Sequence, residues 1–321
     1  MPSLRRYMFG AAVLAVGATL CGPTSAQGKA ATPLAINYAS PNAIWWSIDV
    51  GLDKGFFKDA GFAPESIPFQ NSPQAIQLLI SKSAQIAGVQ PESLMDANRH
   101  GADLVAIAQP ESAPDWSFVV SKSIKTWSDI KGKTIGFSSL KVNEVWLTEK
   151  LLAAHGLTRS DWTGIQVGIT PLKVAAIEKG SIAGAALFEP GAEKAIQGGL
   201  KELGRYAQIG AYPPTLVVAT RGWATENNNG ARVRKAFERA HQWLYDPANR
   251  AEAEQMLVKY TKVDAGIAKK IYEQLFITDK SYSRTGDVDP AGFKRALQLV
   301  ADAGEIAADK LPAPESMMLP R

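Results

Sequence analysis

Residues 34–55 read LAINYASPNAIWWSIDVGLDKG and contain the unit from which we expect the rest of the fold to be built. The first six residues are mostly apolar and predict a short buried strand. A polar turn follows, and then Ile44, Ile48 and Leu52 recur at the spacing of one helix face, which ends at Gly55. A strand, a turn and a helix in this order form the repeating unit of an α/β fold.

The same unit recurs along most of the chain. Short apolar runs predict a first group of strands at 34–39, 65–70, 85–89 and 104–109, and a second group at 134–138, 165–169, 184–188 and 205–209. Further β-type runs at 116–121 and 215–220 follow proline-containing turns and predict strands that cross between two domains. Residues 228–303 predict helices only, and the last ten residues predict an extended surface segment. We therefore expect an α/β protein with two doubly wound, largely parallel sheets.

The composition is that of an ordinary globular protein, with 46% of the 321 residues apolar and 21% charged. These values exclude disordered, collagen-like and coiled-coil chains, and the length suffices for two domains. The net charge is +4, of which Arg5 and Arg6 supply two units, and the remaining charges are spread along the chain. A nucleic-acid surface is therefore not expected, and the partners should be small molecules or proteins.

The first 26 residues have the pattern of an export signal. Arg5 and Arg6 precede an apolar run that is shorter than a membrane span, and small residues follow up to Ala26. We expect cleavage after Ala26 and a periplasmic protein, exported by the general or the twin-arginine route. Cys21 lacks the small preceding residue of a lipidation site. Since it is the only cysteine, the mature chain can form no disulfide and use no thiol chemistry.

Catalytic and metal-binding motifs are not found in the sequence. It contains no G-x-S-x-G, H-E-x-x-H or G-x-G-x-x-G pattern, and residues 132–134 (GKT) lack the first glycine of a phosphate loop. We interpret 132–134 as a turn that enters a strand. His100, His155 and His241 lie on predicted helices or at their ends, where histidine is favoured without any ligand. We expect no enzyme activity, no cofactor and no metal.

The candidate ligand residues lie just after the strands. Open α/β sheets bind ligands at the carboxyl ends of their strands, where helix N-termini favour an anionic group. Ser, Asn and Gln there can bond a ligand, although Ser and Asn also cap helices. The adjacent Trp45 and Trp46 point about 100° apart on a helix, so at least one should line the site. The predicted ligand residues are Ser40, Asn42, Trp45, Trp46, Asn71, Ser72, Gln90, Glu92, Gln109, Glu111, Ser138, Ser139, Lys141, Asn143, Thr170, Phe188 and Glu189.

Residues 51–62, GLDKGFFKDAGF, resemble a segment of the periplasmic substrate-binding proteins of the aliphatic-sulfonate, nitrate, taurine and thiamine-pyrimidine type, which serve ABC importers. The likeness continues in order and spacing through 74–79, 101–108 and 128–136. The resemblance implies a type II periplasmic binding fold, a two-lobe "Venus flytrap" with the ligand between lobes joined by two crossing strands. It also implies a monomer whose partners are a small organic solute and an ABC permease and ATPase complex in the inner membrane. The lobes are expected at 33–115 plus 221–321 and at 116–220.

The sequence departs from that family near the predicted cleft. Residues 138–144 replace a Gly-Ser-rich turn and add Lys141, and Glu92 stands where small or hydroxyl residues are usual. These charges favour a larger organic acid or a zwitterion, possibly with an aromatic part, over a nitrate-like ion. We expect Lys141 and Ser139 to bind the acid group, while a glutamate in the cleft would face an amine or hydroxyl. Glu144 is expected to be a solvated residue in the first turn of a helix.

Three alternatives remain open. The ligand could be a thiamine-precursor pyrimidine or a similar heterocycle. Yeast-type thiamine-pyrimidine synthases share this fold and use pyridoxal phosphate with a histidine and a cysteine cluster. That activity is less expected here, because no histidine follows a strand and the mature chain has no cysteine. A solute sensor that docks on a membrane receptor would have the same sequence features.

Overall fold

The computed structural model describes residues 30–38, 42–69, 71–140 and 142–321, and residues 31–321 form one compact unit. The predicted export signal, Cys21, Ser40 and Lys141 lie outside the described residues. Among the described residues, no helix is both long and apolar enough to cross a bilayer.

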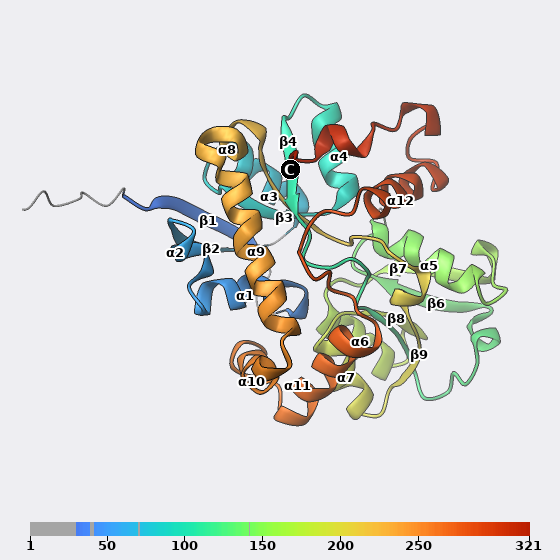
Figure 1. Ribbon diagram of the computed structural model, residues 1–321. Helices are drawn as coiled ribbons and strands as arrows, with labels where there is room; N and C mark the ends of the chain where they lie inside the picture. The colour runs from blue at the N-terminus through green and yellow to red at the C-terminus, as the bar shows by residue number, and fades with distance from the viewer. Residues whose placement is uncertain (1–29, 39–41, 70, 141) are drawn as a thin grey trace, which may run out of the picture. The chain divides into compact units, whose positions relative to one another are not determined.

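The first sheet has the strand order β2-β1-β3-β10-β4 (Figure 1). Its strands are β1 (Thr32–Tyr38), β2 (Phe62–Pro68), β3 (Ile86–Val89), β4 (Leu104–Ala108) and β10 (Leu216–Thr220). β1 runs parallel to β2 and β3, with Ile36 opposite both Ser66 and Ile86, whereas β10 runs antiparallel to β3 and β4. Strands β3 and β4 are buried throughout, as their continuous apolar sequences predict.

The second sheet repeats this plan with the order β7-β6-β8-β5-β9. Its strands are β5 (Ser117–Val120), β6 (Lys133–Phe137), β7 (Trp162–Gln166), β8 (Gly184–Leu187) and β9 (Lys201–Arg205). β6 is parallel to β7 and β8, and β5 is antiparallel to β8 and β9. The predicted α/β class with two doubly wound sheets is confirmed. Both sheets are mixed, because β10 runs antiparallel to its neighbours in the first sheet and β5 does so in the second.

Helices follow the parallel strands. In the first half these are α1 (Trp46–Asp53), α2 (Phe56–Asp59), α3 (Ser72–Ile80) and α4 (Pro91–Arg99), and in the second half α5 (Asn143–Ala153), α6 (Thr170–Glu178) and α7 (Gly191–Gln197). Short 3-10 turns are Ala43–Trp45, Trp127–Ile130, Arg159–Asp161 and Tyr206–Ile209. Prolines in the first turns of α3, α4 and α6 suit helix starts, because proline lacks the N–H that has no partner there. Each of these three helices begins within four residues of the end of the preceding strand.

The C-terminal third is helical, as predicted. It comprises α8 (Arg221–Thr225), α9 (Asn229–Tyr245), α10 (Arg250–Thr261), α11 (Ala265–Tyr272) with a π-helical extension (Glu273–Thr278), and α12 (Pro290–Asp302). Shorter 3-10 turns are Glu226–Asn228, Pro247–Asn249, Ala308–Lys310 and Pro314–Met317. Helix α9 packs on α1, α2 and β4, whereas α12 packs on both α4 and α5 (Figure 1). The tail therefore contacts elements from both halves of the chain.

Three local predictions were wrong. The strand predicted at 165–169 is β7 at Trp162–Gln166, because Gly168 turns the chain with φ 112°. The strand predicted at 205–209 is a 3-10 turn that follows β9, since Tyr206 points into the core and its hydroxyl bonds Thr148. The end of the chain is not simply extended on the surface: Pro314 and Met317 are buried, and Leu319 N donates to the carbonyl of Ala106.

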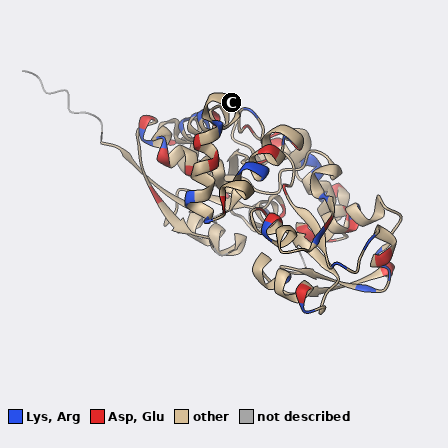
Figure 2. Cartoon of the chain, turned by 90° about the horizontal axis from the view of Figure 1, so that it is seen from below, with Lys and Arg blue, Asp and Glu red and all other residues tan. Residues whose placement is uncertain are grey.

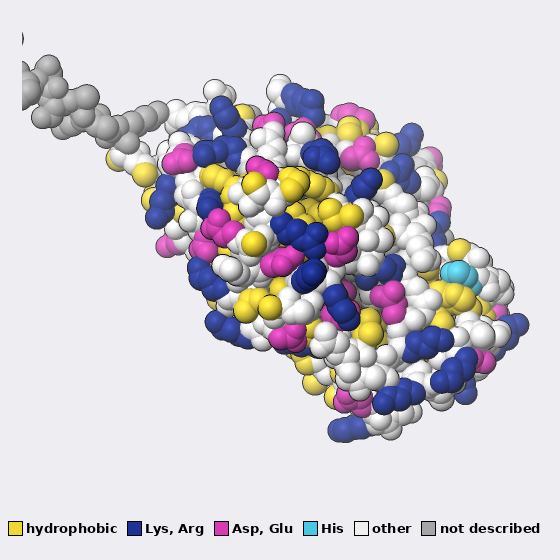
Figure 3. All heavy atoms as spheres, turned by 60° about the horizontal axis from the view of Figure 1, so that its bottom comes forward, with side chains coloured by type: hydrophobic (Ala, Val, Ile, Leu, Met, Phe, Trp, Pro, Cys, Tyr) yellow, Lys and Arg dark blue, Asp and Glu magenta, His cyan; other side chains and the backbone are white. Residues whose placement is uncertain are grey.

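Charges of both signs are interspersed over the chain (Figure 2) and on the face shown in Figure 3.

Candidate functional site

A cavity of about 600 Å³ lies where the carboxyl ends of strands from both sheets meet. The loops after β2, β3, β6, β7 and β8 contribute to it, together with the 3-10 turn before α1 and the segments next to β5 and β10. This is the position at which open α/β sheets bind ligands. The lining residues are Asn42, Ile44, Trp45, Phe69, Asn71, Ser72, Pro73, Gln90, Ser93, Trp116, Ser138, Ser139, Val142, Gly168, Ile169, Phe188, Pro214 and Thr215.

Four aromatic side chains form the apolar part of the cavity wall: Trp45, Phe69, Trp116 and Phe188. The Trp116 and Phe188 rings meet edge to face with centroids 4.8 Å apart. Trp45 lies directly over Gly88 of β3, where a Cβ atom would come within 2.2 Å of the indole. The absence of a side chain at residue 88 therefore allows Trp45 to lie against the sheet.

Amide and hydroxyl groups form the polar part of the wall on the side of the first sheet. Asn42 Oδ1 accepts a hydrogen bond from Ile44 N at 3.0 Å, and Asn71 Oδ1 accepts one from Gln74 N at 2.9 Å. Both side chains therefore act as N-caps, as the sequence allowed, and also line the cavity. Ser72 Oγ accepts from Gln90 N at 3.3 Å.

A hydrogen-bonded chain behind this wall connects the two halves of the structure. Gln90 Nε2 donates to Asn143 Oδ1 at 3.2 Å, and Asn143 Nδ2 donates to the carbonyl of Pro214 at 3.2 Å. Asn143 N donates to Glu92 Oε1 at 3.3 Å. Glu92 is partly exposed as a residue, but its Oε2 atom is enclosed without a partner among the described residues, and burial raises the pKa of its carboxyl to about 7. Asn143 and Glu92 thus support the cavity from outside its lining.

A buried ion pair lies behind the wall on the side of the second sheet. Lys173 Nζ of α6 donates to Glu144 Oε1 of α5 at 2.6 Å, and the two side chains are 0% and 2% exposed. Glu144 Oε2 accepts from both Ser138 N at 3.0 Å and Ser138 Oγ at 2.5 Å. The expectation that Glu144 is solvated is wrong, because helix packing encloses it and supplies a cation. Sequence reasoning missed Lys173, because a lysine on a helix is ordinarily exposed to solvent.

A second group of buried charges surrounds Arg205 at the end of β9. Its Nε donates to Asp279 Oδ2 at 2.7 Å, and its Nη1 lies 3.7 Å from Glu189 Oε1. Glu111 and Asp115, both 0% exposed, lie nearby, and a hydrogen bond joins their two side chains. Burial raises the pKa of Glu111 well above its ordinary value, that of Asp115 to about 7 and that of Glu189 to about 8. We name Glu111, Asp115, Glu189, Arg205 and Asp279 the Arg205 cluster.

The predicted ligand residues divide into two sets. Those that line the cavity are Asn42, Trp45, Asn71, Ser72, Gln90, Ser138, Ser139 and Phe188. Those that do not line it are Trp46, Glu92, Gln109, Glu111, Asn143, Thr170 and Glu189, while Ser40 and Lys141 are not described.

Packing explains why several of the second set lie elsewhere. Trp46 is 1% exposed and packs edge to face on Tyr272 and Phe276, so of the two tryptophans only Trp45 reaches the cavity. Gln109 Oε1 accepts from Asp289 N, and Thr170 Oγ1 accepts from Phe188 N at 3.4 Å. These side chains fix loops rather than contact the cavity.

Sequence reasoning also missed residues that do line the cavity. They are Ile44, Phe69, Pro73, Trp116, Gly168, Ile169, Pro214 and Thr215. Phe69 and Trp116 are large aromatics at strand ends, a signal that was available in the sequence. Ile169 could not be found in this way, because an apolar residue before a helix normally packs in the core.

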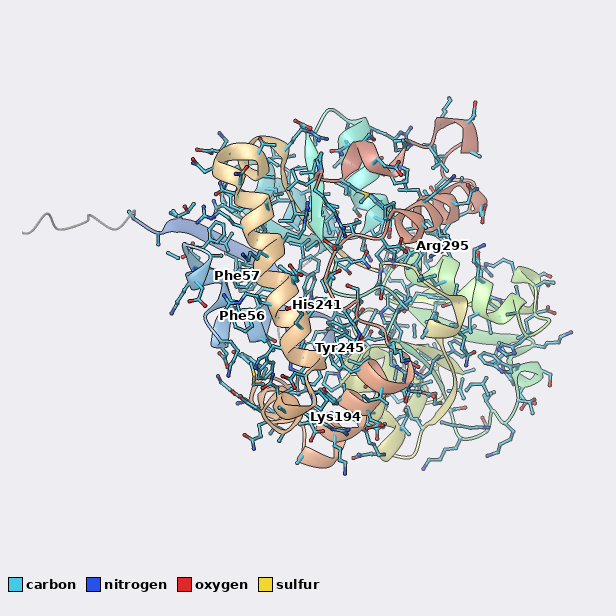
Figure 4. All side chains as sticks on the ribbon, viewed as in Figure 1. Phe56, Phe57, Lys194, His241, Tyr245 and Arg295 are labelled. Atoms are coloured by element: carbon cyan, nitrogen blue, oxygen red, sulfur yellow. The ribbon has the colours of Figure 1, made fainter. Side chains whose placement is uncertain are left out.

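The three histidines lie away from the cavity. His100 Nδ1 bonds the carbonyl of Asp96, and His155 stacks on Trp127. His241 projects from α9 (Figure 4) and is fully buried, and burial lowers its pKa to about 4. Among the described residues, no group of three His, Cys, Asp or Glu side chains could hold a metal ion.

Comparison with known proteins relates this fold to a family. A family model described as NMT1/THI5 like matches residues 47–253, which is more than half of the chain. A search of curated protein sequences gave no match.

Solved structures with the same fold include the periplasmic aliphatic sulphonate-binding protein SsuA from Escherichia coli, with 18% identity over 89% of this chain and 97% of that one and a TM-score of 0.72. The alkanesulfonate-binding protein SsuA from Xanthomonas axonopodis pv. citri, bound to MOPS, has 19% identity over 89% and 96% and a TM-score of 0.69. The periplasmic nitrate-binding protein NrtA from Synechocystis has 15% identity over 87% and 83% and a TM-score of 0.68.

Proposed function

The chain belongs to the NMT1/THI5-like family, and from this premise we propose that it is the solute-binding component of an ABC importer, without catalytic activity. The observation that carries the proposal is the cavity of about 600 Å³ at the strand ends of both sheets, lined by four aromatic and several uncharged polar side chains. Proteins of the same fold that are named for binding sulfonates and nitrate support it.

The proposed ligand is a small organic acid or zwitterion, a carboxylate or sulfonate with an apolar or aromatic middle. Helices α4, α5 and α6 begin at Gln90, Val142 and Ile169 without a side-chain cap, and all three residues line the cavity. The positive dipole end of a helix that begins at the cavity favours a negatively charged group. The aromatic side chains would cover the apolar part of the ligand.

A neutral heterocycle such as a thiamine-precursor pyrimidine is the second candidate. It is favoured by one observation: no charged side chain lines the cavity among the described residues. A flat ring would stack or pack edge to face on Trp116 and Phe188, and the amide and hydroxyl groups would satisfy its ring nitrogens.

The lining of the cavity supports the activity of a pyrimidine synthase less well than it supports solute binding. No histidine or lysine lines it among the described residues, and Lys173, which lies 5.0 Å from the centroid of the Phe188 ring, is bonded to Glu144 behind the wall. A covalent or acid–base step would need such a group within reach of the ligand.

We further propose that the protein acts in the periplasm as a monomer, after cleavage behind Ala26, and delivers its solute to a permease and ATPase complex in the inner membrane. A role as a solute sensor would use the same cavity. The intact mass of the exported protein tests the cleavage: a chain that begins at Gln27 is expected, and a mass that includes residues 1–26 would contradict it.

The two sheets support a division into two lobes near the proposed bounds, 33–115 plus 221–321 and 116–220, except that residues 216–220 form a strand of the first sheet. Strand β5 lies in the second sheet, whereas β10 at Leu216–Thr220 pairs inside the first. The return crossing would then lie just before residue 216, and Trp116, Pro214 and Thr215, which flank both crossings, line the cavity.

Binding and transport test the proposal separately. Native mass spectrometry of the protein as isolated, followed by a thermal-shift screen of sulfonates, carboxylates, amino acids and pyrimidines, should identify one class that binds. Membrane vesicles that contain the importer should then take up that solute only when the protein is added. Turnover of the solute by the protein alone would contradict the binding role, and binding without uptake would favour a sensor.

A further inference from the structure

Hydrogen bonds behind the cavity wall determine which side chains can donate to a ligand and which can only accept. On the side of the first sheet, Asn42 and Asn71 use their carbonyl oxygens to cap helix starts. Their Nδ2 groups remain as donors. Ser72 Oγ accepts from Gln90 N, which leaves its hydroxyl proton to donate. This side of the cavity therefore presents three donors from side chains.

On the side of the second sheet, Ser138 can accept a hydrogen bond from a ligand but cannot donate one. Its hydroxyl donates to Glu144 Oε2 at 2.5 Å, and its backbone N–H donates to the same oxygen at 3.0 Å. A hydroxyl has one proton, so Ser138 can offer only the lone pairs of its oxygen to a ligand.

The ion pair behind Ser138 maintains this direction. Glu144 Oε1 accepts from the Lys173 ammonium group at 2.6 Å, so both carboxylate oxygens are engaged as acceptors. Lys173 is fully buried and lies 5.0 Å from the centroid of the Phe188 ring, which lines the cavity. A carboxylate has no proton to give back to Ser138, and thus the serine cannot reverse its hydrogen bond while the pair is intact.

We propose that the solute spans the cavity with its acid group on Asn42, Asn71 and Ser72 and with a hydroxyl or amine donating to Ser138, a polarity set by the Glu144–Lys173 pair. This inference rests on the proposed organic-acid ligand. It reverses the orientation expected from the sequence, in which the acid group bound at Lys141 and Ser139. Glu144 and Lys173 are positioning residues in this arrangement, because they act on the ligand through Ser138.

Three probes of equal size test the orientation by calorimetry. 4-Hydroxybenzenesulfonate has both the acid and the donor, 4-methylbenzenesulfonate lacks the donor, and 4-hydroxybenzenesulfonamide lacks the charge. In the wild type, the hydroxyl should improve affinity over the methyl group by about three- to tenfold, the range of one hydrogen bond. Ser138→Ala should abolish that advantage without weakening 4-methylbenzenesulfonate. Ser160→Ala, in the exposed 3-10 turn Arg159–Asp161 and outside the cavity lining, is the control and should change neither affinity by more than about twofold.

Two further variants test the other end and the positioning pair. Asn71→Asp keeps the cap on Gln74 N but replaces the donor with a negative charge, so it should weaken both sulfonates by about tenfold or more and the sulfonamide much less. Glu144→Gln has an amide that can donate to Ser138, so it should reduce the preference for hydroxyl over methyl. If Glu144→Gln does not fold, Ser138→Ala still decides the question.

The outcomes separate the two proposals. Equal weakening of both sulfonates by Ser138→Ala or Ser139→Ala, with no effect of Asn71→Asp, would place the acid group on the second-sheet side and overturn the orientation. An unchanged hydroxyl preference in Ser138→Ala would overturn it as well. Failure of all three probes to bind the wild type would reject the aromatic-acid ligand class of the proposed function, and the orientation with it.

Discussion

At the scale of single residues, Gly88 determines where Trp45 can lie. A Cβ at residue 88 would meet the indole at 2.2 Å, whereas one at Gly222 of α8 would meet nothing within 4 Å. Gly88→Ala should therefore push Trp45 into the cavity and weaken binding of 4-hydroxybenzenesulfonate by about tenfold, since overpacking costs about 1 to 3 kcal/mol. Calorimetry measures the affinity, and Gly222→Ala is the control. Equal affinities of wild type and Gly88→Ala would show that Trp45 does not limit the cavity.

Glu111 in the Arg205 cluster makes stability depend on pH. Burial, and then the Asp115 carboxylate, raise the pKa of Glu111 well above its ordinary value, so the folded protein keeps a proton that the unfolded chain releases above about pH 4. The free energy of unfolding should therefore fall as the pH rises above about 5. Asp115, whose pKa burial raises to about 7, contributes to the same fall. Glu111→Gln should remove part of this loss, so that its stability relative to the wild type is greater at pH 8 than at pH 5.

Denaturant unfolding at pH 5 and pH 8 measures this difference. Glu65→Gln, on the exposed edge strand β2, is the control, and its stability should fall with pH as that of the wild type does. The other charged groups around Glu111, which are Arg205, Glu189 and Asp279, are unchanged in both variants. A Glu111→Gln protein whose stability falls with pH as steeply as that of the wild type would contradict the assignment.

At the scale of elements, the Glu144–Lys173 pair joins α5 to α6. Lys173→Met leaves a buried carboxylate without its cation and should destabilise the protein by about 3 kcal/mol, whereas the double variant Lys173→Met/Glu144→Leu should recover most of this loss. Lys150 and Asp302 form the matched exposed pair, which joins α5 to α12 at 3.0 Å with exposures of 45% and 44%. Lys150→Met should cost less than about 1 kcal/mol. Urea unfolding compares the variants, and equal losses for the two lysines would show that burial does not strengthen the first pair.

At the scale of the whole molecule, the proposed lobes predict hinge closure. The two segments that join the sheets carry Trp116, Pro214 and Thr215 into the cavity wall, so a ligand there contacts both sheets and their connections. The radius of gyration from small-angle scattering should decrease when the best ligand of the screen saturates the site. The same ligand should leave a Ser138→Ala protein less closed at equal concentration. An unchanged radius at full occupancy would contradict closure.

The fold was largely predictable because its signals are local. Period-2 and period-3.6 patterns predicted both groups of strands and the helical C-terminal third, and the likeness around residues 51–62 agrees with the family model that matches 47–253. The misplaced strands at 165–169 and 205–209 are short apolar runs beside turns. There the backbone conformation of Gly168 and the burial of Tyr206 decided the element boundaries. Neither can be derived from hydropathy.

The sequence by itself determined the α/β class, the order of the elements and the edge of the sheets at which a ligand could bind, because all three follow from residue spacing along the chain. Only the tertiary structure decided which side chains line that edge and which lie behind it. Trp45 and Trp46 are adjacent in sequence, yet one lines the cavity and the other fills the core. Glu144 finds its cation 29 residues away on another helix. Partners and burial depend on how distant elements pack, and spacing along the chain carries no information about that packing.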